Sequence, residues 1–110
     1  MAINKIEKMI SSSIHTLIWR KHAQQEAEKD QISESKLEDS LRNKFKIIEN
    51  YPDDPYGESV LVLTDVNNTP VHVVLSPREN LCYLITIYLP TTDKWNKTFT
   101  RRLKNGKNIM

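Results

Sequence analysis

The 110-residue sequence predicts a single α+β domain in which N-terminal helices pack on a mainly antiparallel, four-stranded sheet, followed by a short C-terminal helix. As far as residue 41, apolar residues recur at spacings of three and four, the period of a helix lying on a core. Beyond residue 44 the chain changes to short apolar segments separated by turn residues, which is typical of strands. With 38% hydrophobic residues it can build one modest core. We therefore expect one domain over residues 1–110, with residues 103–110 as a frayed tail.

Three segments of the first half favour helices. Residues 3–14 carry isoleucines on one face, and residues 22–29 are rich in the strong helix formers Ala, Gln, Glu and Lys. Between them, residues 16–20 favour a brief strand, with a continued helix as the alternative. Ser33 is the expected N-cap of a further helix that extends through Leu41.

Strands are expected at residues 45–48, 59–64, 71–75 and 81–89. The links between them are short and contain Pro, Asp and Asn, which predicts an antiparallel meander. Residues 60–63 and 73–75 are apolar on both faces, so we expect helices on one side of the sheet and either the C-terminal tail or a partner over part of the other. After Pro90, the sequence Thr91-Thr92-Asp93 is a suitable cap for the short C-terminal helix.

The distribution of charge says more than its total. The sequence has 16 basic and 14 acidic residues, for a net charge of +2, but residues 1–50, 51–90 and 91–110 carry +1, −4 and +5. A nucleic acid would therefore approach the tail and the cations near residue 20. The single cysteine, Cys82, excludes an intramolecular disulfide, and no apolar run is long enough for a membrane helix. We expect a cytoplasmic protein with no membrane contact.

The residue types present point to metal-independent chemistry. The sequence has no Gly-rich phosphate loop, no closely spaced histidine pair and no Gly-x-Ser-x-Gly, so we expect neither a metal nor a cofactor. Metal-independent RNA cleavage needs an acid, a base and cations for the phosphate, which His, Tyr, Lys and Arg supply. The candidate catalytic residues are His72, Tyr88 and His22, and the candidate RNA-binding residues are Arg20, Arg78, Lys94, Arg101 and Arg102.

Each candidate also has a purely structural interpretation. His72 alternates with valines on a strand and suits a half-buried, hydrogen-bonded histidine. Tyr88 suits an aromatic residue at the edge of the core, and His22 a residue that fixes a helix start. Trp95 suits a packing anchor better than a base-stacking platform, and the tail cations suit a solvated surface.

Three stretches resemble a known family: the Tyr-Pro-Asp-Asp-Pro loop within residues 47–59, Pro70-Val71-His72-Val73-Val74, and the Ile-Thr-x-Tyr-x-Pro strand end at residues 85–90, with Trp95 beyond. They resemble small prokaryotic proteins catalogued mainly as a domain of unknown function, which look like distant relatives of the RelE/ParE, MqsR and BrnT toxins. The resemblance spans roughly residues 3–103. It implies a RelE-like fold, cleavage of mRNA, free or on the ribosome, and inhibition by a zinc-ribbon, helix-turn-helix antitoxin of the MqsA type.

One departure from the family pattern concerns phosphate binding. Members commonly carry an arginine one turn after the His22-Ala23 pair, where this chain has Gln25-Glu26-Ala27-Glu28. If that arginine binds phosphate in the family, this chain has either lost the contact or moved the task to Arg20 or the tail. The sequence thus predicts a toxin-type RNA endonuclease. The alternative is a non-enzymatic protein-binding module with a toxin-like fold, which the strands apolar on both faces favour.

Overall fold

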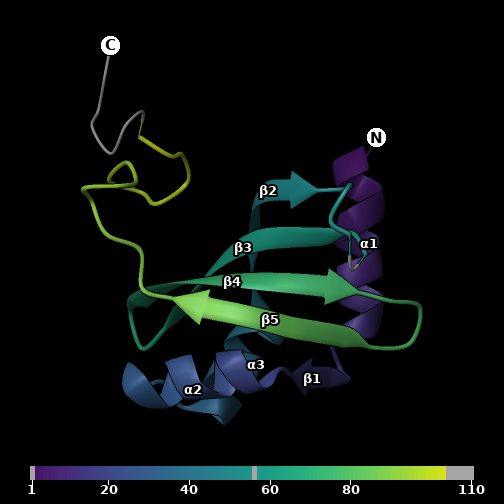
Figure 1. The fold of residues 1–110 in the computed structure, drawn as a ribbon, viewed down its shortest axis with the longest axis horizontal. Coiled ribbons are helices and arrows are strands. Elements are labelled where there is room, and N and C mark those ends of the chain that lie inside the picture. Colours follow the sequence, from purple (N-terminus) through teal and green to yellow (C-terminus); the bar gives the residue numbers. More distant parts are fainter. Residues whose placement is uncertain (1, 56, 104–110) are drawn as a thin grey trace.

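The computed structural model describes residues 2–55 and 57–103, and within them the chain forms three helices and five strands (Figure 1). The helices are α1 (Ala2–Ser13), α2 (Lys21–Lys29) and α3 (Glu34–Asn43). The strands are β1 (Leu17–Trp19), β2 (Lys46–Tyr51), β3 (Ser59–Val66), β4 (Thr69–Pro77) and β5 (Cys82–Tyr88). They build one sheet in the order β1-β5-β4-β3-β2. None of the described helices is long and apolar enough to cross a membrane.

The sheet is mixed, so the prediction of a four-stranded antiparallel sheet was wrong in part. The four expected strands do form an antiparallel meander from β2 to β5. The brief strand favoured at residues 16–20 is present as β1, and it pairs with β5 in parallel, Leu17 lying opposite Cys82. No tight turn connects β1 to β5, so no local sequence signal indicates which strand β1 pairs with. The sequence pattern therefore could not place this three-residue strand in the sheet.

Local sequence chemistry explains the ends of several elements. The Ser33 side chain accepts a hydrogen bond from the backbone N–H of Lys36 at 3.3 Å, which confirms the predicted cap of α3. The turn between β3 and β4 places Asn67 and Asn68 at φ values of 52° and 67°. Asparagine tolerates this left-handed conformation, and two such residues in succession make the tight turn that suits a twisted hairpin.

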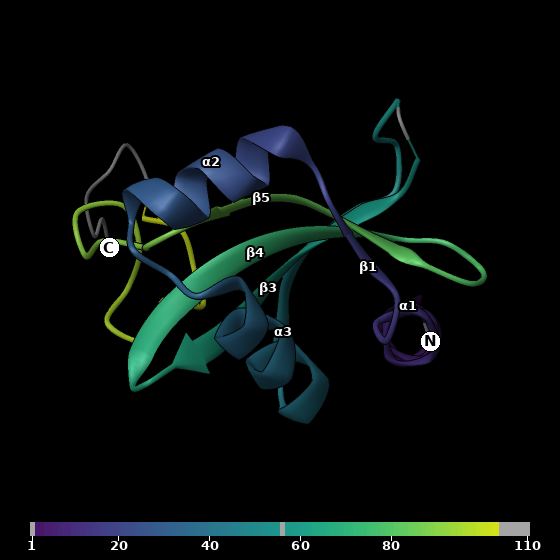
Figure 2. The same cartoon turned by 90° about the horizontal axis from the view of Figure 1, so that it is seen from below.

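The core lies between the helices and one face of the sheet. Leu37 and Leu41 of α3 and Ile10 of α1 are fully buried in it, against Val62 and Val73 of the central strands. Figures 1 and 2 show α1 and α3 on the same side of the sheet, and α2 running along β5 beyond the end of β1. α1 and α3 thus leave the other side of the sheet, here called the open face, to be covered by other parts of the chain.

The C-terminal segment, residues 90–103, covers one end of the open face. Its Trp95 is 2% exposed and lies edge-on to the His72 ring, with the ring centroids 4.4 Å apart. The sequence left open whether the C-terminal tail or a partner covers this face. The C-terminal segment covers at least this end of it. The frayed tail predicted at residues 103–110 lies, apart from Leu103, outside the described residues.

The predicted short C-terminal helix was wrong, because residues 90–103 form turns and one isolated bridge between Trp95 and Arg102. The Asn96 side-chain oxygen accepts hydrogen bonds from the backbone N–H groups of Thr100 and Arg101. Phe99 takes a left-handed φ of 61°. A short polar side chain that accepts hydrogen bonds from nearby backbone N–H groups stabilises a turn that competes with the helix. In residues 90–103 the turn forms and the helix does not.

Candidate functional site

The pairing of the strands arranges the open-face side chains in rows that cross the sheet. His72 lies opposite both Leu63 on β3 and Tyr88 on β5. The neighbouring row runs from Glu49 on β2 through Val74 on β4 to Thr86 on β5. Because side chains on a strand alternate between faces, these rows project away from α1 and α3. The register thus joins His72 and Tyr88, which lie 16 positions apart in the sequence.

His72 is completely buried and both of its ring nitrogens are engaged. Nε2 lies 2.7 Å from the carbonyl oxygen of Phe99, which can only accept, so Nε2 carries the proton. In the neutral ring, Nδ1 is then the acceptor for the Tyr88 hydroxyl, 3.0 Å away. Burial lowers the pKa of His72, although the bond to Phe99 and the negative charge of Glu49 oppose this shift. The resting state is therefore a neutral ring of defined tautomer.

Tyr88 is the half-buried member of this pair. Its ring packs edge-on to His72 with the centroids 5.1 Å apart, and burial raises the pKa of its hydroxyl to about 12. A free tyrosinate is thus rare at neutral pH. Since the hydroxyl already points its proton at Nδ1 of His72, the pair can pass a proton from Tyr88 to the imidazole.

A second set of contacts fastens the C-terminal segment to β2. The Arg102 guanidinium makes a two-pronged ion pair with Glu49, with Nε 2.7 Å and Nη2 3.1 Å from the carboxylate oxygens, and it lies 4.7 Å from the Trp95 ring centroid. The Tyr51 hydroxyl donates to the same carboxylate. Burial alone would raise the pKa of Glu49, but the hydrogen bonds from Arg102 and Tyr51 outweigh it and hold this pKa below its usual value. This ion pair helps to hold the carbonyl of Phe99 over His72.

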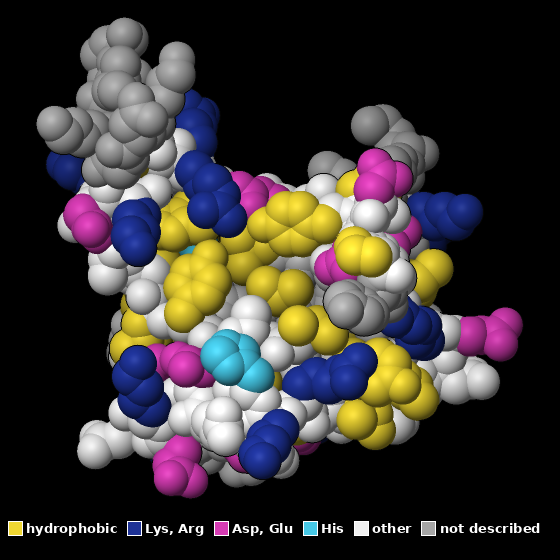
Figure 3. Space-filling model, viewed as in Figure 1, with side chains coloured by type: hydrophobic (Ala, Val, Ile, Leu, Met, Phe, Trp, Pro, Cys, Tyr) yellow, Lys and Arg dark blue, Asp and Glu magenta, His cyan; other side chains and the backbone are white. Residues whose placement is uncertain are grey.

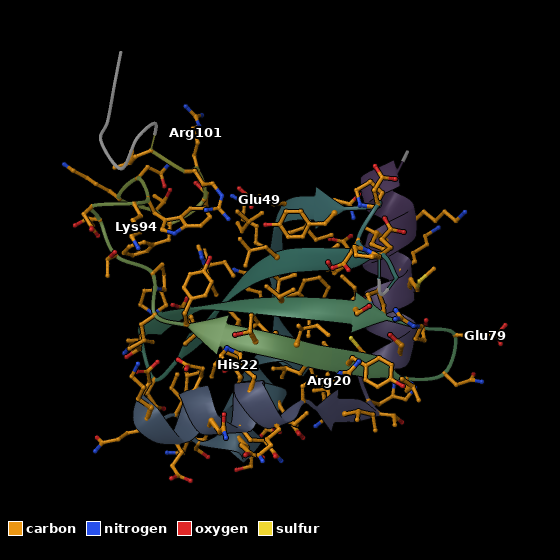
Figure 4. All side chains as sticks on the ribbon, in the orientation of Figure 1. Arg20, His22, Glu49, Glu79, Lys94 and Arg101 are labelled. Atoms are coloured by element: carbon orange, nitrogen blue, oxygen red, sulfur yellow. The ribbon has the colours of Figure 1, made fainter. Side chains whose placement is uncertain are left out.

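A pocket of about 500 Å³ opens beside β5, at the other end of the open face. Arg20 and His22 enter it from the start of α2, and Asp54 and Gly57 from the loop between β2 and β3. The end of β4 and the middle of β5 supply its remaining lining, which consists of Ser76, Arg78, Ile85 and Thr86. Figure 4 shows Arg20 and His22 in front of the β5 edge, while Lys94 and Arg101 lie on the C-terminal segment beyond Glu49.

The structure divides the predicted site residues among three places. His72, Tyr88 and Arg102 belong to the contacts beneath the C-terminal segment, and Arg20, His22 and Arg78 meet at the pocket. Lys94 and Arg101 are exposed on the C-terminal segment. Figure 3 shows basic side chains on both sides of an apolar area of this face.

Sequence reasoning missed Glu49 and Tyr83, which hold charged candidates in place. Glu49 pairs with Arg102 across 53 positions, a separation that no local motif reveals. A signal was available in the alternation of Glu49 with Tyr51 just beyond the strand predicted at residues 45–48. The observed β2 extends to Tyr51, which puts both side chains on one face. Tyr83 had no signal, because its role depends on two arginines from different elements that meet over its ring.

The fold and this face define a small α+β domain whose open sheet carries a histidine–tyrosine pair between two groups of cations. The chain belongs to the family described as Domain of unknown function (DUF4258), whose model matches residues 19–89. That span includes the pocket, His72 and Tyr88, whereas Lys94, Arg101 and Arg102 lie beyond it. No curated protein and no solved structure matches the chain.

Proposed function

We propose that this protein is a metal-independent RNA endonuclease of toxin type, with a RelE-like arrangement of helices and sheet. The observation that carries the proposal is the hydrogen-bonded pair of Tyr88 and His72, with its fixed tautomer, between two groups of cations on the open face. Such a pair supplies proton transfer, and the cations supply the phosphate contacts that RNA cleavage requires.

The first step uses Tyr88 as the group that touches the substrate. The ribose 2′-oxygen attacks the adjacent phosphorus and gives its proton to the Tyr88 oxygen, while Tyr88 passes its own proton to Nδ1 of His72. The resulting imidazolium keeps its Nε2–H bond to Phe99 and is favoured by the nearby negative charge of Glu49. His72 is buried, so it acts through Tyr88 as a positioning and proton-accepting residue.

The bond that breaks joins phosphorus to the 5′-oxygen of the next nucleotide, and this oxygen needs a proton. His22 is exposed at the pocket and is the proposed acid. Arg20 and Arg78 would bind phosphates on the side of α2, and Lys94 and Arg101 on the side of the C-terminal segment. Arg102 is already paired with Glu49, so its guanidinium is less available to a phosphate than the exposed Lys94 and Arg101.

The matching biological setting is a toxin held in check by a protein partner. We propose a zinc-ribbon, helix-turn-helix antitoxin as that partner, mRNA as the substrate, free or on the ribosome, and the cytoplasm as the compartment. The apolar side chains Val74 and Ile85 are partly exposed, and Ile85 lines the pocket together with Arg20 and Arg78. They provide a surface that such a partner would cover.

The test is cleavage of labelled RNA by the purified chain in the presence of a chelator, with free RNA and with translating ribosomes. We expect products that end in a 2′,3′-cyclic phosphate. Tyr88→Phe should lower the rate by at least about 100-fold, the usual worth of acid–base catalysis, and His72→Gln should lower it too. His15→Gln is a matched control, since His15 is exposed outside the open face. Absence of cleavage in both settings refutes the enzyme, and full activity of Tyr88→Phe refutes the role of this pair.

The second candidate function is a protein-binding module without enzymatic activity. The apolar area on the open face, between the basic side chains in Figure 3, favours it. Expression in a bacterial host separates the two. Growth arrest that an adjacent gene product relieves supports the toxin, whereas harmless expression with co-purification of a neighbour supports the module.

A further inference from the structure

Two arginines from different elements meet over one aromatic ring beside the pocket. The guanidinium carbon of Arg20, at the start of α2, lies 4.9 Å from the ring centroid of Tyr83. That of Arg78, just after β4, lies 5.4 Å from the same centroid. Tyr83 lies on β5 opposite Ser76 and next to β1, so its ring is fixed by two neighbouring strands. Both cations therefore contact the same side chain.

The position of Arg78 is constrained further by its other contacts. Its Nη1 donates to the Ser76 hydroxyl and to the carbonyl oxygen of Pro77. Its guanidinium also lies against Gly57, where a Cβ would stand 2.5 Å from Nη2. Gly57 has a φ of +111°, so a side chain at this position is disfavoured by conformation as well as by space. A side chain at residue 57 would therefore displace the guanidinium and strain the loop between β2 and β3.

The charges of the pocket favour an anion. Arg20 and Arg78 bring two positive charges, and Asp54, whose carboxylate accepts a hydrogen bond from Ser59 at 2.9 Å, brings one negative charge. Guanidinium groups match the geometry of phosphate oxygens, and a pair held at fixed separation loses little freedom on binding.

We infer that Tyr83 is a positioning residue that holds Arg20 and Arg78 as a clamp for a phosphate group in this pocket. The inference rests on the proposed function for its substrate, and it makes that phosphate a non-scissile one of the bound RNA. Thr86 lines the pocket and lies two residues before Tyr88 on β5, about 7 Å along the strand. The clamp therefore binds the RNA backbone beside the reacting bond and contributes to affinity rather than to the chemical step.

The experiment uses the full chain and two probes, a short RNA with every ribose 2′-O-methylated, which cannot react, and inorganic pyrophosphate. We expect Tyr83→Leu to weaken the binding of both probes by about tenfold, because it removes two cation–π contacts. Tyr83→Phe keeps the aromatic ring and should bind within about twofold of the unaltered protein. In cleavage of ordinary RNA, Tyr83→Leu should raise KM and leave kcat unchanged.

Controls keep the result decisive. If Tyr83→Leu fails to fold, Arg20→Gln tests the clamp at an exposed position, and Lys29→Gln removes an equal charge from the far end of α2 as its match. Equal loss in Arg20→Gln and Lys29→Gln overturns the clamp, as does wild-type binding by Tyr83→Leu.

The two proposals fail in different ways. Pyrophosphate binding that depends on Tyr83, without any binding or cleavage of RNA, supports the clamp and refutes the endonuclease. Cleavage of RNA with a KM that is independent of Tyr83 refutes the clamp and leaves the endonuclease standing. No binding of either probe, together with no cleavage, refutes both.

Discussion

Acid should destabilise this fold through His72 before it protonates most carboxylates. A histidine in the unfolded chain titrates near its ordinary pKa of 6.5, whereas burial lowers the pKa of the folded ring. At pH values between these two, the unfolded state binds more protons, so the free energy of unfolding falls as the pH is lowered. The stabilisation is fully present above the unfolded pKa. The unfolded ring takes up at most one proton, with a pKa of 6.5. The free energy of unfolding can therefore fall by no more than about 1.3 kcal/mol between about pH 7 and pH 5.5.

The assay is urea unfolding at several pH values, all above pH 5. Below the ordinary carboxyl pKa of 4.5, the lowered pKa of Glu49 adds a second loss of stability in acid. We expect His72→Gln to remove most of this pH dependence and His15→Gln to retain it. NMR titration of the His72 ring gives the same information without a substitution. Stability that rises on acidification, or an unchanged slope in His72→Gln, would refute the account of a buried neutral ring.

Three further changes test other parts of the fold by urea unfolding. Trp95→Ala should lower the free energy of unfolding by about 3 kcal/mol, the usual cost of removing a buried aromatic side chain, and should speed trypsin cleavage of the C-terminal segment. Arg102→Gln should cost about 1 kcal/mol, because its ion pair with Glu49 and its contact with the Trp95 ring are partly exposed. Asn68→Gly should stabilise by up to about 1 kcal/mol, since Asn68 has a φ of 67° and glycine adopts this conformation without strain.

Features set by neighbouring residues could be predicted from the sequence. The cap at Ser33 and the turn at Asn67-Asn68 depend on side chains within three positions, and both are present. The parallel pairing of β1 depends on β5, far along the chain, and no local pattern encodes it. The prediction of a C-terminal helix was wrong because the Asn96 side chain accepts hydrogen bonds from backbone N–H groups that a helix would use. Helix propensity alone does not show this competition.

The candidate site shows the same boundary between local and distant information. His72 and Tyr88 could each be named from residue type and strand position, but their hydrogen bond follows from the register of β4 and β5. The buried state of His72 depends on Phe99 and Trp95, which come from a segment predicted to be helical. Sequence reasoning therefore found chemically useful groups and could not say which of them meet.

The parallel pairing of β1 also has a consequence for the order in which parts of the molecule open. The β2–β5 meander is joined by short turns, whereas β1 closes a long loop through only three residues, with Arg20 following directly and bonding its backbone N–H to Leu84 at 3.0 Å. Local unfolding of this edge would cost less than opening the central strands. Arg20 and His22 would then leave the pocket while His72 and Tyr88 stayed paired. Amide hydrogen exchange would detect this as earlier labelling of residue 20 than of β4. The pocket end of the open face would thus open more often than the end that holds His72 and Tyr88.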